Sequence, residues 1–192
     1  MRLWNGWGNE DSDLTMELSD GLRALLEALV GPGTALSQAT LNEVIAKVPN
    51  TRLDDHPQIN TDPETRVRHA RGQSLPDWLE MHSGNVDTFP DGVAFPESSE
   101  QVRELLAHAK ENNLIVIPYG GGTSVVGHIN PETSDKPVLT IDMAKMNSML
   151  SIDTESQLAT FGAGAPGPVV EEELKKHGYT LGHFPQSWEL SP

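Results

Sequence analysis

A glycine-rich stretch, PYGGGTSVVGH at residues 118–128, carries the most distinctive chemistry in this chain of 192 residues. Three consecutive glycines leave successive backbone N–H groups without side chains in front of them, and such a nest binds an anion without lysine or arginine. Two hydroxyl side chains follow at once, in Thr123 and Ser124. The stretch therefore predicts an anion-binding loop, with a plain glycine turn between two strands as the open alternative.

Two familiar phosphate-binding motifs do not fit these glycines. A nucleotide-triphosphatase loop needs Gly-Lys before Ser or Thr, and no lysine follows Gly122. The dinucleotide fingerprint G-x-G-x-x-G would need a third glycine where the chain has Val125. No long amphipathic helix follows either, because Gly127 and Pro131 interrupt the next residues. An ordinary nicotinamide-binding Rossmann site is therefore excluded.

The composition argues against partners that bind through bulk charge. Thirteen Lys and Arg stand against 28 Asp and Glu, a net charge of −15, so nucleic acid and anionic membranes would both be repelled. An anionic ligand must therefore be held by local donors. There are no cysteines, which excludes disulfides and thiolate metal sites. With no signal-peptide pattern and no apolar run of about 18 residues, we expect a cytoplasmic protein without a transmembrane segment.

The remaining titratable residues form no metal-binding pattern. The histidines lack the spacing of metal ligands on one helix, so we expect no metal site and structural roles for them. The acidic run at 171–173 lies in the first turns of a predicted helix, where a solvated face is favoured by the helix dipole. Asp142 and Asp153 each close a predicted strand and are expected to cap turns.

The first part of the chain, residues 1–85, has a mostly helical and irregular pattern. Leucines at helical spacing predict a helix between Ser19, a candidate N-cap, and Gly31, a candidate stop. A second short helix is predicted within 37–48, with its apolar residues on one face. These residues would precede the part of the chain that carries the glycine loop.

Residues 49–64 are rich in Pro, Asn and Asp, a composition typical of a linker or surface loop. Three of the four tryptophans also lie in the first part, at Trp4, Trp7 and Trp78. Large aromatic side chains in so polar a chain are expected to pack against other elements.

From residue 86 short apolar runs alternate with helical periodicity. Strands are predicted at 92–96, 114–118 and 137–143, with a helix at 98–113 between the first two. Ser98 and Gln101 have the spacing of a capping box at the start of that helix. The near-continuous apolar run at 114–118 is typical of a strand buried on both faces. The strand–helix–strand order predicts a parallel crossover unit.

A second sheet element is predicted after the crossover unit. Apolar runs at 149–153 and 157–164 are separated by a short polar turn, which indicates a hairpin. A helix is predicted at 167–178, with acidic residues early, lysines late and glycine as its stop. The fold class is therefore α+β. A small parallel sheet is flanked by helices, the start of a second sheet follows, and the two parts are residues 1–85 and 86–192.

The order of these motifs resembles the FAD-binding domain of the vanillyl-alcohol-oxidase type, or PCMH type. Two stretches carry this resemblance, FPDGVAFPESSEQVRELLAHAKENNLIVIPYGGGTSVVG and LTIDMAKMNSMLSIDTESQLATFGAGAPGPVVEEEL. In that family the glycine-rich loop holds the FAD pyrophosphate. Three further stretches are similar to one branch of that family, the alkyldihydroxyacetonephosphate synthases and bacterial FAD-linked oxidases. They are LWNGWGNEDS near the start, TRVRHARGQSLPDWL, and HGYTLGHFPQSWELSP at the end.

The resemblance implies two FAD-contacting segments. The first consists of Pro118, Tyr119, Gly120, Gly121, Gly122, Thr123 and Ser124. The second, nearer the flavin ring, consists of Gln186, Ser187, Trp188, Glu189, Leu190, Ser191 and Pro192. Here Gln186 stands where an Asp is usual and Pro192 where a Thr is usual, so the side-chain hydrogen bonds at these two positions depart from the family pattern.

The resemblance also implies that FAD is bound noncovalently. Members of the wider family that tether the flavin carry a histidine directly after the glycine pair, and that position is Thr123 here. His128 is expected to be a loop residue that faces solvent or a phosphate.

By the same resemblance, a full-length protein would exchange the acyl group of acyl-dihydroxyacetone phosphate for a fatty alcohol, or act as a related FAD-linked oxidoreductase. By the resemblance, the family's cap domain and catalytic residues lie beyond Pro192, and no residue of this sequence matches the family's catalytic set. We expect an incomplete domain with exposed strand edges at 149–164, and the missing part could be a separate chain. The alternative is a truncated or split product that binds FAD weakly or not at all and is not catalytic alone.

Overall fold

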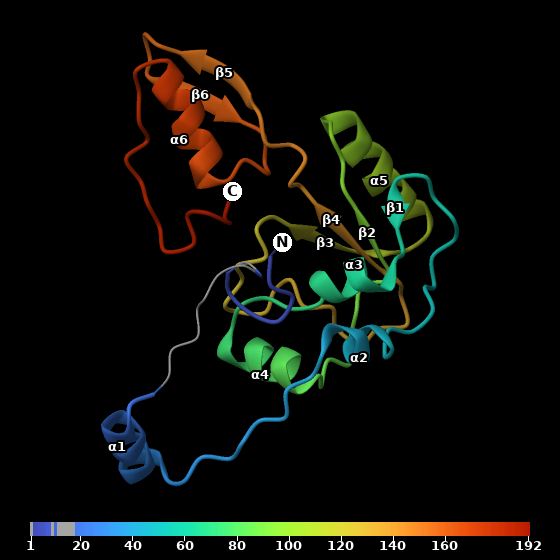
Figure 1. The fold of residues 1–192 in the computed structure, drawn as a ribbon. Helices are drawn as coiled ribbons and strands as arrows, with labels where there is room; N and C mark the ends of the chain where they lie inside the picture. Colours follow the sequence, from blue (N-terminus) through green and yellow to red (C-terminus); the bar gives the residue numbers. More distant parts are fainter. Residues whose placement is uncertain (1, 9, 11–17) are drawn as a thin grey trace.

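A four-stranded sheet forms the centre of the computed structural model, which describes residues 2–8, 10 and 18–192 (Figure 1). The strands lie in the order β1-β2-β4-β3. Their bounds are Ile59–Asn60 for β1, Gly92–Ala94 for β2, Val138–Asp142 for β4 and Ile115–Tyr119 for β3. β2 and β3 both run parallel to β4, and β1 pairs antiparallel with β2. The predicted mixed fold with a small parallel sheet is confirmed.

Helix α5, Ser99–Glu111, makes the crossover from β2 to β3. Its Leu105 is buried in a cluster with residues of β2 and β4, so the predicted apolar face covers the sheet. Ser98 accepts a hydrogen bond from the N–H of Gln101 at 3.2 Å, as the capping-box spacing predicts. The return bond differs, because Gln101 Oε1 accepts from the N–H of Glu97, at 2.7 Å, and not from that of the N-cap.

The strand buried on both faces is β4, and the prediction that placed the β3 run there is wrong. All five residues of β4 are buried, whereas Ile115 and Val116 in β3 are half-buried and Pro118 is exposed. β3 forms the edge of the described sheet, a position that tolerates a proline without an N–H group. The apolar run indicated a strand, but the order of strands depends on long-range contacts that periodicity does not contain.

Three short helices build a second core below the sheet in Figure 1. They are α2 Leu41–Ile45, α3 Pro63–Arg68 and α4 Leu75–Ser83. Their buried residues cluster with residues that lead into β2, and Trp4 and Trp78 pack against this cluster, as predicted. Trp7 is half-buried.

The predicted linker at residues 49–64 is bound to the sheet. It contains β1, and Arg52 donates two side-chain hydrogen bonds to the buried carboxylate of Asp91, at 2.9 and 2.7 Å. A two-residue strand has no periodicity to detect, so sequence reasoning missed it. The segment belongs to the same packed body as β2, and the division at residue 85 stays a prediction.

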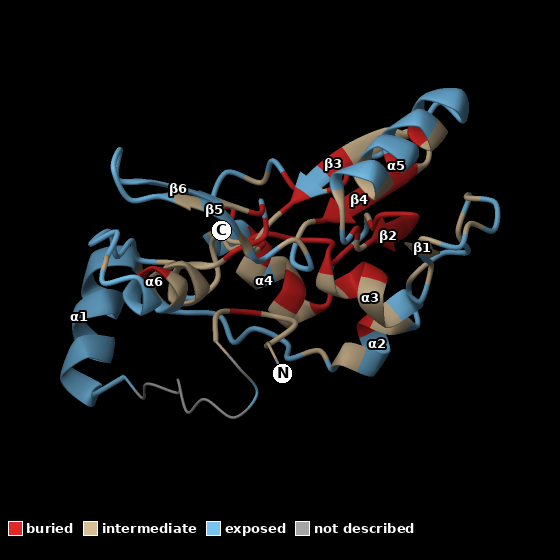
Figure 2. Cartoon of the chain, turned by 90° about the horizontal axis from the view of Figure 1, so that it is seen from above, coloured by how far each residue is buried: buried red, intermediate tan, exposed pale blue. Residues whose placement is uncertain are grey.

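Helix α1, Asp20–Val30, has both predicted caps but no buried residue. Ser19 accepts from the N–H of Leu22 at 3.3 Å, and Gly31 ends the helix at φ +89°. Leu25 is 54% exposed and Leu29 71% exposed, and the helix is exposed throughout in Figure 2. The leucine pattern correctly predicted the helix without predicting its burial.

The second sheet is the hairpin of β5, Met149–Asp153, and β6, Leu158–Phe161, followed by α6, Gly167–Lys176. The strands pair antiparallel, as predicted, and Gly178 follows α6 at φ +81°. Leu150 and Leu158 are 64% and 66% exposed, which confirms the expected apolar surface on this element. Within the described residues, no helix is long and apolar enough to cross a membrane.

Candidate functional site

The glycine loop leaves the sheet at Tyr119, the last residue of β3. Gly122 has φ +65°, a left-handed conformation that glycine adopts without strain. At Gly121 an added Cβ atom would overlap the carbonyl group of Leu190. The glycines therefore serve both a tight turn and the close approach of the chain's last residues.

The backbone N–H groups of residues 121–124 donate no hydrogen bond to any residue that the structure describes. Gly122 and Ser124 are nevertheless buried, and buried N–H groups normally have partners. Successive unpaired N–H groups around a left-handed residue form a concave site for an anion. The loop geometry thus fits a ligand with a phosphate or pyrophosphate group.

The end of the loop is fixed to the start of α4. The Ser124 carbonyl accepts from the N–H of Gln73 at 2.6 Å. The Ser124 hydroxyl lies 3.0 Å from Nδ1 of His128. The His128 side chain is exposed, in agreement with the expected solvent-facing loop residue.

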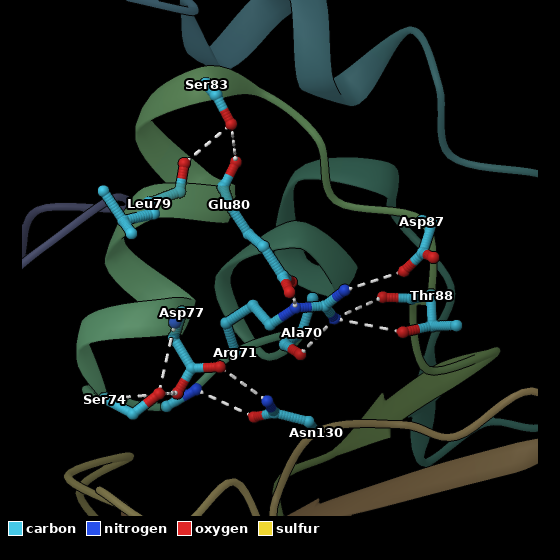
Figure 3. A network of polar contacts seen from close by, with 11 residues as sticks. Ala70, Arg71, Ser74, Asp77, Leu79, Glu80, Ser83, Asp87, Thr88 and Asn130 are labelled. Atoms are coloured by element: carbon cyan, nitrogen blue, oxygen red, sulfur yellow. Dashed lines mark hydrogen bonds and ion pairs between the residues drawn. The ribbon is translucent and has the colours of Figure 1, made fainter. Parts of the chain in front are cut away.

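A polar network around the start of α4 strengthens this anchor (Figure 3). Asn130 donates to Asp77 at 2.6 Å and accepts from the N–H of Gly72 at 3.0 Å. Asp77 also accepts from the Ser74 hydroxyl at 2.6 Å in the capping box of α4. Arg71 binds Glu80 and Asp87 on the far side of this network, at 2.6 and 3.0 Å. The C-terminal end of the first predicted segment, at Ser124, is therefore held by hydrogen bonds at the start of α4.

The second predicted segment, residues 186–192, folds as a turn against the first. The Ser187 carbonyl accepts from the N–H groups of Leu190 and Ser191 at 2.9 and 2.8 Å. The Ser191 hydroxyl lies 2.8 Å from that of Thr123 and 2.6 Å from that of Ser187. Trp188 fixes the segment to α6, because its carbonyl accepts from the N–H of Gly167 at 3.1 Å. The structure thus brings the two segments together.

A cavity of about 350 Å³ lies where the two segments meet. Its lining includes six predicted residues, Tyr119, Gly120, Gly121, Glu189, Leu190 and Pro192. The other eight lie outside its lining, namely Pro118, Gly122, Thr123, Ser124, Gln186, Ser187, Trp188 and Ser191. The Gln186 side chain is exposed, so the position at which the family pattern has Asp makes no contact with the cavity.

Sequence reasoning missed the arginines of this cavity, whose lining also contains two acidic residues, Asp142 and Glu189. Three arginines line it, Arg2, Arg68 and Arg71, in a chain of net charge −15. Arg68 pairs with Glu64 at 2.8 Å and Arg71 with Glu80 at 2.6 Å. Arg2 lies two residues before the Trp-Asn-Gly-Trp-Gly stretch, which begins at Trp4. That motif was recognised in the sequence, but nothing in it indicated a contact with a loop more than a hundred residues away.

His69 and Asp142 form a buried pair in the same wall, with Nε2 2.9 Å from Oδ2. Asp142 Oδ1 also accepts from the N–H of Ala144 at 2.8 Å, which confirms the predicted turn cap. His69 Nδ1 lies 2.7 Å from the Thr65 carbonyl, which can only accept, so this nitrogen carries a proton. The pair joins α3 to the end of β4, a structural role as expected for the histidines.

Tyr119 lies between this pair and the glycine loop, with its ring centroid 4.6 Å from that of His69. Burial raises the pKa of its hydroxyl, and the nearby Arg2 guanidinium acts in the opposite direction. The net shift is upward, so the phenol is neutral at physiological pH. Tyr119 therefore contributes a neutral wall to the cavity.

A larger cavity of about 560 Å³ lies between the hairpin and α6. It is lined mainly by apolar side chains, including Phe161, Leu174 and Leu181. Pro192 is the single predicted site residue among its lining residues. This cavity lacks the run of backbone donors that the glycine loop supplies.

Known proteins resemble the chain along almost its whole length. An alkyldihydroxyacetonephosphate synthase of Dictyostelium discoideum is 32% identical over 98% of this chain and 36% of its own length. The synthase of Trypanosoma brucei brucei is 37% identical over 70% of this chain and 22% of its own. A solved structure of an alkyldihydroxyacetonephosphate synthase, 29% identical, superposes on 99% of this chain and 41% of its own with a TM-score of 0.79.

These matches cover a minor part of each relative, so the chain spans between about a fifth and two fifths of their lengths. The family model described as "FAD binding domain" matches residues 90–191, which include the glycine loop, the hairpin, α6 and nearly all of the second segment. By this match over more than half of its length, the chain belongs to the FAD binding domain family.

Proposed function

We propose that this chain holds FAD noncovalently, as the cofactor-binding portion of a flavin-dependent enzyme of the alkyldihydroxyacetonephosphate synthase type. The observation that carries this proposal is the run of N–H groups at residues 121–124 without partners among the described residues. They lie beside the second segment, whose backbone reaches Gly121. In this proposal the residues of both predicted segments, 118–124 and 186–192, contact the cofactor.

The pyrophosphate is the group that the glycine loop suits. Its charge would be bound by backbone dipoles, which require no lysine beside the loop. The hydroxyls of Thr123 and Ser191, 2.8 Å apart, hydrogen bond to each other, so one of the two can donate to a ligand at the junction of the segments. When bound, the flavin supplies the electron-accepting and electron-donating ring on which the chemistry of such enzymes depends.

Two observations support noncovalent binding. Thr123 occupies the position directly after the glycines, and its hydroxyl is not a nucleophile of the kind that tethers a flavin ring. His128 lies four residues after Ser124 and hydrogen bonds back to it. A denatured protein that releases all of its flavin on precipitation would agree with this proposal, and flavin retained on the polypeptide would contradict it.

The complete protein would make an alkyl-dihydroxyacetone phosphate, as the names of the two synthase relatives state for those proteins. A related FAD-linked oxidoreductase is the second candidate, because the family match concerns the cofactor domain and not the substrate. Cap domain and catalytic groups would then come from residues outside this sequence, in the same polypeptide or a separate one. A cytoplasmic location remains part of this proposal.

Titration of the purified chain with FAD, followed by flavin fluorescence, tests the proposal. We expect saturable binding at one FAD per chain. Gly121→Ala should weaken it about tenfold or more, because a Cβ there overlaps Leu190 and displaces the second segment. Gly33→Ala is the matched control, since a Cβ at Gly33 meets no atom within 4 Å. A parent protein that does not bind FAD would instead support the truncated, non-binding alternative.

A further inference from the structure

Arg2 contacts the glycine loop from the side of its carbonyl groups. Its Nη1 donates to the carbonyl oxygen of Gly121, and its Nη2 lies 3.5 Å from that of Gly122, a long hydrogen bond. Among the described residues the guanidinium donates to these carbonyls, lies near the Tyr119 hydroxyl and pairs with no carboxylate. A cation is thus directed at the backbone of the loop and not at an acidic side chain.

The residues around Arg2 hold it in this place. Arg68 on α3 donates to the Arg2 carbonyl at 2.8 Å, and Arg68 is itself paired with Glu64. The N–H of Leu3 donates to the Gly8 carbonyl at 3.0 Å and closes the Trp-Asn-Gly-Trp-Gly stretch into a turn. Trp4 then packs against the core of α2, α3 and α4. The guanidinium is therefore presented to the loop by a folded segment.

The two contacts determine where the neighbouring N–H groups point. In a trans peptide the C=O and the following N–H point in opposite directions. Carbonyls of consecutive residues alternate along a strand, but the left-handed Gly122, at φ +65°, lets two of them face the same guanidinium. The N–H groups of Gly122 and Thr123 must then both point away from Arg2, on the same side of the loop.

We propose that Arg2 is a positioning residue for the FAD pyrophosphate, one that orients the N–H groups of Gly122 and Thr123 by holding the carbonyls of Gly121 and Gly122. The inference rests on the proposed function and adds a residue from the opposite end of the chain to that site. A cation on the carbonyl side also polarises both peptide groups, which strengthens their N–H donors. This explains how a loop without lysine in a chain of charge −15 can hold an anion.

The test compares Arg2→Ala with Arg103→Ala, which removes the same charge from the exposed surface of α5, where Arg103 pairs with Glu100. Affinities for FAD, ADP and adenosine are measured by calorimetry, and backbone amide shifts are recorded by NMR without ligand. We expect R2A to weaken FAD and ADP about tenfold and to leave adenosine unchanged. It should also move the amide resonances of Gly122 and Thr123, whereas R103A should change none of these quantities.

Added guanidinium ion, far below denaturing concentrations, should partly restore ADP binding to R2A. Arg2→Lys, which keeps the charge but not the planar two-pronged donor, should bind with intermediate affinity, and it serves as the test if R2A does not fold. Unchanged FAD affinity in the Arg2 variants would overturn the inference. Weakened affinity with unmoved loop amides would overturn it too, because Arg2 would then contact the phosphate directly. No FAD or ADP binding by the parent protein would overturn the proposed function and the inference with it.

Discussion

The four-stranded sheet and the β5–β6 hairpin differ sharply in burial, although segments from both regions meet at the glycine loop. β4 is buried throughout its length, whereas no residue of β5 or β6 is fully buried. An isolated two-stranded hairpin is marginally stable in water and needs further strands or a helix packed against it, and here α6 has one buried residue, Leu174. The two segments of the proposed cofactor site are therefore supported unequally: the glycine loop follows a strand of the buried sheet, whereas the second segment follows an exposed hairpin and α6.

Removal of a buried charge from the sheet region should have the largest effect. The Asp91 carboxylate accepts from the N–H of Val138 at 2.7 Å and from Arg52. Asp91→Ala leaves a buried N–H without its acceptor, and Arg52 without its partner. We expect a loss of about 3–5 kcal/mol in the free energy of unfolding, measured by urea denaturation. A loss as small as that of Asp153→Ala, at the exposed turn of the hairpin, would contradict the contrast.

A matched pair of leucines tests burial more directly. Leu139 in β4 is fully buried and Leu158 in β6 is 66% exposed. Leu139→Ala should lower the free energy of unfolding by about 2–5 kcal/mol, and Leu158→Ala should change it by less than about 0.5 kcal/mol. Equal losses in the two variants would show that the hairpin has a core as complete as that of the sheet.

A fall in pH should lower the stability of the whole fold through the sheet region, but it should cause only a local change in the hairpin region. Burial raises the pKa of Asp91, but hydrogen bonds from Arg52 and Val138 outweigh it and hold the pKa below the ordinary value of 3.8. A lowered folded-state pKa stabilises the protein above that ordinary value, and this stability is lost as pH falls through the folded-state pKa. Urea midpoints should therefore decline below about pH 4, and a D91N variant should show less of this decline.

In the hairpin region the same fall in pH should act locally. The hydrogen bond from the Thr180 hydroxyl, with those from the N–H groups of Gly182 and Leu181, lowers the pKa of Glu171. Protonation should release the loop at 180–182 while the sheet stays folded. Amide shifts of Leu181 and Gly182 that move before global unfolding would agree with this, and a single cooperative change of all amides would not.

The smallest effect is expected at α1, whose apolar residues are exposed. Leu29→Ser should change the free energy of unfolding by less than about 0.5 kcal/mol, because Leu29 is 71% exposed and belongs to no core cluster. A chemical denaturation curve compared with that of L139A checks this. A loss above 2 kcal/mol would mean that α1 packs against the body of the protein.

Local signals were sufficient for most elements. The glycine stops, the Ser19 and Ser98 caps and the apolar runs predicted helices, strands and hairpin close to their observed bounds. Long-range pairing was not encoded in these signals. The central place of β4, the two-residue β1 and the exposure of α1 each depend on which distant residues pack together, and a periodic pattern does not contain that information.

In the candidate site, too, local motifs were predicted from the sequence and contacts between distant residues were not. The glycine loop and the second segment were recognised from their motifs, and the structure brings Thr123 and Ser191 together. The arginines of the cavity were not found, because the motifs beside Arg2 and around Arg68 do not indicate which distant residues these side chains contact. Their place beside the site follows from the fold alone, which places residue 2 against residue 121.

The most direct test of the central claim is an amide NMR titration of the ligand-free chain with ADP and, separately, with adenosine. ADP should move the backbone amide resonances of Gly121, Gly122, Thr123 and Ser124, whose N–H groups have no partners among the described residues. Adenosine, which lacks the diphosphate, should leave them in place. ADP or FAD that binds without moving these four resonances would contradict the assignment of the glycine loop as the pyrophosphate site.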